Sequence, residues 1–272
     1  MKMERYQNEL EYAIKAAVQA GEVLEKEKLA EVDAADGRDI KLVMDRKSEA
    51  VIMECLEETG IPVLSEECGF RGGSEENLKK GKLWIIDPLD GSANYWKGMR
   101  ELACVSVALW ENGKPVLGVV NRFYCDELFS GVAGAGAWLN GSQIMVSGVE
   151  QPSGGVLASG FPLKRSYEGA DLERFIKWTQ NFKKIRMLGA AALMGTFVAC
   201  GRVDAYMEES IMLWDIAAAA AIVLGAGGAL ELELREAFQC VCGMYASEAL
   251  RTRAAEMAGT AVQEESVSGK LC

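Results

Sequence analysis

The sequence feature that most constrains this chain is an apolar run at residues 83–86 that ends at Asp87-Pro-Leu-Asp-Gly91. A short apolar run bounded by turn-forming residues predicts a buried strand, with Asp87 at the point where the strand leaves its sheet. Pro88 removes a backbone donor and bends the chain, and Asp90 is well placed to cap a helix that follows it. Two carboxylates at such a turn can converge on one point, where cations must offset their mutual repulsion.

Two further acidic positions lie where predicted elements begin or end. Glu66 and Glu67 follow the apolar segment 61–65, and Trp214-Asp215 opens an alanine-rich segment with helical character. If these side chains meet, hard carboxylate oxygens in a sequence without histidine favour Mg²⁺ over Zn²⁺. Taken alone, the motif at 87–91 fits equally well a solvated turn whose residues only cap a helix.

Charge and composition exclude several classes of protein. The 272 residues carry a formal net charge of −11, and no run of lysine and arginine is suited to tracking a nucleic-acid backbone, so we expect no nucleic-acid partner. The eight cysteines are scattered without a CxxC pair, which is typical of reduced core residues in a reducing compartment. The start of the chain lacks the apolar core of a signal peptide, and the uncharged run 216–230 is shorter than the roughly 20 residues of a membrane span. We therefore expect a cytoplasmic protein without membrane attachment.

The apolar periodicity predicts helices and strands without a regular βαβ rhythm, which indicates a layered α+β fold. Turn signals such as Asn112-Gly113 separate three strands of an antiparallel meander. The glycine-rich segment 69–81 is expected to be a mobile surface loop, and a boundary near 146–155 divides the chain into halves at 1–147 and 148–272. The predicted helices are 6–28, 47–59, 172–181, 190–200 and 215–224, and the predicted strands are 61–65, 83–86, 104–110, 116–122, 127–132, 156–159, 205–207 and 229–232.

Three separated motifs together resemble those of the inositol monophosphatase family. They are an acidic pair before a loop, a D-P-[LI]-D-G-[TS] segment, and W-D at a helix start followed by a glycine-rich turn. In this chain they read Ser65-Glu-Glu67, Asp87-Pro-Leu-Asp-Gly-Ser92 and Trp214-Asp-Ile-Ala followed by Gly225-Ala-Gly-Gly228, with weaker matches at 117–120, 134–141 and 203–206. The resemblance extends over roughly residues 8–255. It implies the family's α-β-α-β-α sandwich, usually found as a homodimer.

The resemblance also implies two or three Mg²⁺ ions in each active site. Glu66, Asp87 and the carbonyl of Leu89 would hold the first ion. Asp87, Asp90 and Asp215 would hold the second, with Asp87 bridging the two. A third and weaker ion would use Glu66 and water. Li⁺ would compete at the second position, which makes lithium sensitivity an expected property.

The implied reaction is hydrolysis of a phosphate monoester by a metal-activated water. A hydroxyl at the position of Ser92, linked to Asp45, would orient and deprotonate that water, and Glu66 would assist. Asp45 also fits a simple helix cap before Lys47, and Trp214 fits packing better than substrate contact. The amides after Asp90 would form an anion cradle at a helix start. The residues implied to bind substrate are Asp90, Gly91, Ser92, Ala93, Ala191, Glu208 and Asp215, with the register of Glu208 and Glu209 left open.

Four departures from the family pattern affect the substrate assignment more than the metal site. Ala93 replaces the second of two threonines, Ala190 a serine or threonine, and Gly225 a glutamate, and the segment 96–102 is one residue longer than usual. Inositol monophosphate is the leading substrate. The alternatives are fructose 1,6-bisphosphate, 3′-phosphoadenosine 5′-phosphate (against which Ala93 argues) and a catalytically weak metal-binding or regulatory homologue. A second substrate phosphate would need cations, for which the candidates are Lys97, Arg100, Lys164, Arg165 and Arg186.

Overall fold

The computed structural model describes residues 2–27, 32–36, 39–161 and 169–258. All strands of the larger of its two main sheets come from the first half of these residues. Neighbouring strands of this sheet are antiparallel, except for one parallel pair, β3 with β5. In spatial order its eight strands are β10 (Ser142–Gln143), β9 (Gly136–Leu139), β8 (Glu127–Val132), β7 (Lys114–Arg122), β6 (Cys104–Glu111), β5 (Lys82–Asp90), β3 (Val63–Ser65) and β4 (Gly69–Arg71).

The smaller sheet has five strands and comes from the second half of the described residues. In spatial order they are β12 (Lys184–Arg186), β11 (Val156–Ala158), β13 (Ala205–Met212), β15 (Gln239–Tyr245) and β14 (Ala229–Leu234). The pairs β12–β11 and β11–β13 are parallel, and the remaining pairs are antiparallel. A separate antiparallel hairpin is formed by β1 (Val32–Asp36) and β2 (Asp39–Leu42).

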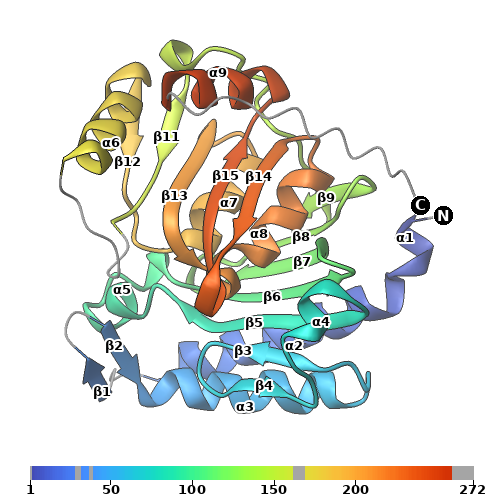
Figure 1. The fold of residues 1–272 in the computed structure, drawn as a ribbon. Helices are drawn as coiled ribbons and strands as arrows, with labels where there is room; N and C mark the ends of the chain where they lie inside the picture. Colours follow the sequence, from blue (N-terminus) through green and yellow to red (C-terminus); the bar gives the residue numbers. More distant parts are fainter. Residues whose placement is uncertain (1, 28–31, 37–38, 162–168, 259–272) are drawn as a thin grey trace.

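Helices cover both sheets and fill the space between them (Figure 1). The helices α2 (Gln7–Lys26) and α3 (Val43–Glu57) cover the outer face of the larger sheet. The helices α7 (Ala191–Ala199) and α8 (Leu213–Gly225) lie between the sheets. The helices α6 (Ala170–Asn181) and α9 (Glu248–Ala258) lie on the outer face of the smaller sheet. The short helices are α1 (Lys2–Arg5), α4 (Glu76–Lys79) and α5 (Ser92–Trp96), with 3₁₀ turns at Arg100–Leu102, Phe123–Cys125, Pro152–Gly154 and Glu236–Phe238. This is the expected α-β-α-β-α sandwich.

The packing of β5 and α8 shows why the layers form. Along β5, Leu83 and Ile85 contribute to the core between the sheets, whereas Trp84 and Ile86 contribute to the core under α2 and α3. Alternate residues of a strand point to opposite faces, so a strand buried on both faces must be apolar throughout. The helix α8 approaches the larger sheet so closely that a Cβ at Gly118 would lie 2.1 Å from a backbone oxygen of α8. Small residues on both sides therefore set this spacing.

The meander of β6, β7 and β8 confirms the sequence-based prediction, and most predicted helices and strands occur within a few residues of their expected bounds. Other expectations were wrong or incomplete. The segment 69–81 holds β4 and α4, and α3 begins at Val43, four positions before the expected start. The hairpin β1–β2, the strand β15 and the helix α9 were not predicted. The division into halves at 1–147 and 148–272 stays a proposal. No helix in the described part of the chain is long and apolar enough to cross a membrane.

Candidate metal centre

The site is built around the end of β5, where its ladder with β6 is irregular. Asp87 and Asp90 both pair with residues of β6, but the register shifts between them. Pro88 explains the shift, because a proline has no amide hydrogen for the ladder and a bulge re-aims the side chains beside it. The amide of Leu89 donates to Asp87 Oδ1 at 3.0 Å, which orients this buried carboxylate.

Glu66 begins the tight turn between β3 and β4. Gly69 ends this turn with a φ of 66°, a conformation that glycine adopts without strain. Glu49 of α3 holds the turn in place, because its carboxylate accepts hydrogen bonds from the Ser65 hydroxyl and from the Cys68 amide, the latter at 3.1 Å. The position of Glu66 therefore depends on a second carboxylate that comes from the helix layer.

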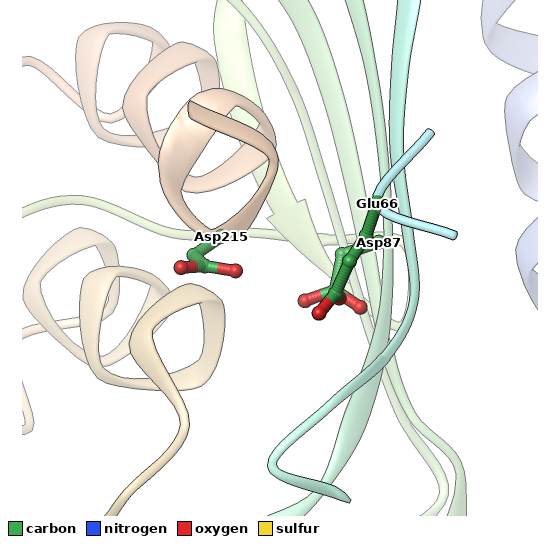
Figure 2. Close-up of side chains that lie close together, drawn as sticks. All are labelled: Glu66, Asp87 and Asp215. Carbon is green, nitrogen blue, oxygen red and sulfur yellow. The ribbon is translucent and has the colours of Figure 1, made fainter. Parts of the chain in front are cut away.

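Asp215 lies in the first turn of α8, where its carboxylate accepts the amide of Met212 at 3.2 Å and helps to cap the helix. Figure 2 shows this side chain facing Glu66 and Asp87 across the site. One carboxylate oxygen of each residue lies within 4.8 Å of the others. The structure thus brings together three of the four carboxylates that the sequence singled out as metal ligands.

The electrostatics of these carboxylates fit a divalent cation. Burial first, and then the charges of Glu66, Asp90 and Asp215, raise the pKa of Asp87 well above its ordinary value. Burial and the charges of Glu66 and Asp90 likewise raise the pKa of Asp215. Carboxylates that are buried against one another are stabilised by an added positive charge, and clustered hard oxygens are the ligands that Mg²⁺ prefers. The donor set therefore fits Mg²⁺.

Asp90 has different partners from those expected. Its carboxylate accepts the amides of Ala191, Ala192 and Leu193 at 3.1, 2.8 and 3.4 Å, so it caps α7 and not the helix that follows it. Unpaired amides and the positive end of the dipole attract an anion to a helix start. Burial raises the pKa of Asp90 to about 6, and these amides and the Cys104 thiol counteract that rise. A role for Asp90 as a metal ligand, or for Ala191 in binding substrate, stays a prediction.

The structure joins Ser92 to Asp45, as the resemblance implies. The Ser92 hydroxyl lies 3.1 Å from Asp45 Oδ1 and 2.9 Å from the carbonyl oxygen of Leu89, so its proton has two acceptors. Asp45 is buried inside the first turn of α3, two residues after Val43. It therefore does not cap a helix that begins near Lys47. The same carbonyl of Leu89 was the expected metal ligand, and that role stays a prediction.

The remaining expected substrate-binding residues come from the start of α5 and from β13. Gly91 has a φ of 86°, and a Cβ there would lie 2.7 Å from a backbone oxygen, so only glycine fits before α5. Ala93 is exposed in the first turn of α5, whose amides have no partner within the helix. Glu208 is buried, accepts the Tyr206 hydroxyl at 2.9 Å, and has a pKa raised to about 7, mainly by burial and further by the charge of Asp90. Its neighbour Glu209 points to the opposite face of β13.

Two contacts at the site were missed by sequence reasoning. One is the turn-holding carboxylate of Glu49, and the other is Cys104, whose thiol lies 3.5 Å from Asp90 Oδ2. Burial, with the charges of Asp90 and Asp87, raises the pKa of Cys104 well above its ordinary value, so this thiol keeps its proton and donates. Neither residue belongs to a sequence motif. Each contact joins separated segments of the chain, so no local pattern in the sequence could have predicted it.

The structure also bears on the departures from the family pattern. A Cβ at Gly225 would lie 2.3 Å from the backbone oxygen of Gly136, so the end of α8 has no room for a glutamate there. Ala190 is buried against the position that a Cβ of Gly91 would occupy. Both small residues fit close backbone packing.

Three of the five cations considered for a second phosphate have other contacts in the structure. Lys97 lies over the Trp96 ring at 3.7 Å, and Arg100 donates to the carbonyl of Glu27 and to Tyr124. The guanidinium of Arg186 donates to the carbonyl of Ile185. Lys164 and Arg165 lie outside the described residues.

Comparisons with known proteins agree with this architecture. The model of the inositol monophosphatase family matches residues 5–249. The fold is similar to that of an inositol monophosphatase from Anabaena (Nostoc) sp. PCC 7120, with a TM-score of 0.79 and 31% identity over 94% of this chain and 96% of that one. An IMPase from Thermotoga maritima gives a TM-score of 0.77 and 27% identity over 93% of this chain and 97% of that one. The protein named Nus factor SuhB in Xylella fastidiosa is 38% identical over 222 residues, which are 79% of this chain and 78% of that protein. With its sequence motifs, its sandwich fold and its carboxylate cluster, this chain belongs to the inositol monophosphatase family.

Proposed function

We propose that the chain is a Mg²⁺-dependent phosphomonoesterase that acts on a small phosphorylated metabolite, with inositol monophosphate as the first candidate. The observation that supports this most directly is the convergence of Glu66, Asp87 and Asp215 within 4.8 Å. These residues would hold the cations, and the resemblance adds Asp90 and the carbonyl of Leu89 as ligands. When bound, the cations supply positive charge to the phosphate oxygens and Lewis acidity toward water.

The chain's own residues would position water and phosphate around that charge. A hydroxyl accepts as well as donates, so Ser92 can receive a hydrogen bond from water while its own proton is shared by Asp45 and the carbonyl of Leu89. As water gives a proton to the Ser92 oxygen, the hydroxyl's own proton can pass to the carboxylate of Asp45, which is a suitable final acceptor. The first amides of α5, at Ser92 and Ala93, would donate to phosphate oxygens. Glu208 would accept hydrogen bonds from the hydroxyl groups of the leaving alcohol.

A substrate panel tests the proposal. Phosphate release is measured for inositol monophosphate, fructose 1,6-bisphosphate and 3′-phosphoadenosine 5′-phosphate, with Mg²⁺ and with a chelator. We expect release from the first substrate to require Mg²⁺ and to fall by about 10³-fold or more in Asp87→Asn, because the variant loses a cation-binding charge. The exposed Asp126→Asn is the matched control and should keep its activity. Release that persists with the chelator, or an unaffected Asp87→Asn, contradicts the assignment.

A second candidate is a non-catalytic role. It is favoured by the 38% identity to a protein named Nus factor SuhB, and it corresponds to the metal-binding or regulatory homologue considered from the sequence. The same panel separates the two candidates, since wild-type protein that binds Mg²⁺ but releases phosphate from no substrate would support the non-catalytic role.

The homodimer and the cytoplasmic location are also proposals, because both come from the resemblance and from sequence composition. Sedimentation velocity tests the first of them. A single species at twice the mass of the 29.5 kDa chain is the expected result.

A further inference from the structure

Three half-buried aromatic rings lie in a row at the rim of the core between the sheets. The ring centre of Phe238 lies 5.7 Å from that of Phe70 at an interplanar angle of 73°, and 5.9 Å from that of Trp214 at 48°. Phe238 therefore packs between the other two rings, in the tilted arrangements that aromatic pairs prefer. We call this row the aromatic bridge.

The two outer rings of the bridge belong to the segments that carry two carboxylates of the candidate metal centre. Phe70 lies in β4 and pairs with Leu64 across the hairpin whose turn begins at Glu66. Trp214 directly precedes Asp215 at the start of α8. These two segments are distant in the sequence and belong to different layers. Phe238 comes from a third segment, the turn between β14 and β15, which reaches the larger sheet in Figure 1.

The turn that carries Phe238 has an uncommon backbone conformation. Ala237 has a φ of 52° and Phe238 a φ of 63°, so two consecutive residues with side chains lie in the left-handed region. Such a backbone conformation is unfavourable for a residue with a side chain and persists only where its surroundings hold it. Here a hydrogen bond of 2.7 Å from the Arg235 amide to the Gln239 carbonyl closes the turn around them. The strained turn and the two ring contacts place Phe238 between the segments that carry the carboxylates.

We infer that Phe238 is a positioning residue that sets the separation of the Glu66 and Asp215 carboxylates through Phe70 and Trp214. This inference rests on the proposed Mg²⁺-dependent function. Without cations, like charges push the β3–β4 turn and the start of α8 apart. Packing of Phe238 against both segments opposes that movement, so the ligands are already close when Mg²⁺ arrives. Replacing a residue that holds metal ligands in position typically weakens metal binding by about 10–100-fold.

The test measures the dissociation constant of Mg²⁺ by titration calorimetry on protein without substrate. The variants are Phe238→Ala and Phe238→Leu, with Phe238→Tyr as the conservative replacement that keeps the ring. The matched control is Phe197→Leu, because Phe197 is also half-buried and packs on the same core from the last turns of α7. Circular dichroism at the titration temperature verifies that each variant is folded.

We expect Phe238→Leu and Phe238→Ala to bind Mg²⁺ about 10-fold more weakly or worse, and both Phe238→Tyr and Phe197→Leu to bind it as the wild type does. Unchanged affinity in Phe238→Leu, or an equal loss in Phe197→Leu, overturns the positioning role and leaves the proposed function intact. Wild-type protein that binds Mg²⁺ without hydrolysing any substrate overturns the proposed function alone. Wild-type protein that does not bind Mg²⁺ overturns both.

Discussion

At the scale of single residues, the hydroxyl of Ser92 is the group whose chemistry can be separated most cleanly from packing. Replacing Ser92 with alanine removes the oxygen between Asp45 and the carbonyl of Leu89 and leaves the candidate metal-binding carboxylates in place. We expect the chemical step to slow by roughly 10²-fold or more, the usual scale for a positioned proton acceptor, with the Mg²⁺ dissociation constant unchanged. Single-turnover kinetics at saturating Mg²⁺ measure this step.

Ser48→Ala is the control for that experiment. Its hydroxyl is also buried near the end of β5, but its proton is donated to the carbonyl of Pro88 at 2.7 Å. The control should affect stability more than the single-turnover rate. Equal rates in Ser92→Ala and wild type would reduce Ser92 to a structural role.

Gly225 allows a second prediction at this scale, about stability. Alanine is a better helix former than glycine by about 1 kcal/mol, yet a Cβ at Gly225 would lie 2.3 Å from the backbone oxygen of Gly136. Forcing an extra carbon into close packing costs about 1–3 kcal/mol, so we expect Gly225→Ala to lower the free energy of unfolding. In Gly154→Ala, where a Cβ would meet no atom within 4 Å, the free energy should stay within about 0.5 kcal/mol. Urea denaturation measures both, and a more stable Gly225→Ala would refute the packing argument.

At the scale of elements, a half-buried charge cluster joins the end of β7 and the start of β8 to the loop after α7. The Glu127 carboxylate accepts hydrogen bonds from Arg122 at 2.8 Å and from Arg202, and the Arg202 hydrogen bond is the main cause of its lowered pKa. A carboxylate whose pKa is lowered by folding stabilises the folded state fully at a pH above the ordinary pKa of 4.5. That stabilisation is lost as the pH falls through the lowered pKa of the folded state.

Glu127→Gln should therefore be less stable than wild type at neutral pH, and the difference should narrow once the pH falls below about 4.5. Urea denaturation from neutral pH down to the acid limit of folding measures this difference. A difference that stays constant across the acid range would show that the charge of Glu127 does not contribute.

The helix α7 also shows how an element acts on the site. Its three first amides hold the carboxylate of Asp90, so the orientation of that side chain depends on where the inter-sheet helix begins. The residues before α7 are linked to α5, because the side-chain amide of Asn94 donates to the carbonyl of Leu188 at 2.7 Å. Elements from the two halves of the chain thus meet at one carboxylate.

At the scale of the whole molecule, the candidate metal centre lies where the larger sheet meets the helices between the sheets. Asp87 belongs to β5 of the larger sheet, Glu66 to the turn between β3 and β4 of that sheet, and Asp215 to α8. A cation that all three hold would therefore link two layers of the sandwich. Binding to the folded chain alone shifts the unfolding equilibrium, by about 2.7 kcal/mol at a ligand concentration 100 times the dissociation constant.

We therefore expect the Tm to rise with Mg²⁺ concentration in the wild type. The rise should be absent in an Asp87→Asn/Asp215→Asn double variant, which also lacks the repulsion and should be more stable than the wild type without Mg²⁺. Thermal scans across a Mg²⁺ series measure both effects. The same rise in the double variant would mean that these carboxylates do not form the binding site.

Features that depend only on neighbouring residues could be predicted from the sequence. An apolar run before Asp87 makes a strand end, Trp214-Asp215 starts an apolar helix, and the motifs around them identify the family and its sandwich. Such signals are local because the periodicity of side chains follows from the geometry of one strand or helix. They sufficed to single out four carboxylates, three of which converge in the structure.

Tertiary structure alone decided which distant segments touch these residues. Asp90 faces the start of α7 instead of capping α5, Glu49 holds the turn at Glu66, and Phe238 packs between two rings from other segments. The absent side chain at Gly225 is explained only by the backbone oxygen that occupies its place. No local sequence pattern encodes these contacts. The packing of whole layers decides which amide, ring or carbonyl comes close to each side chain.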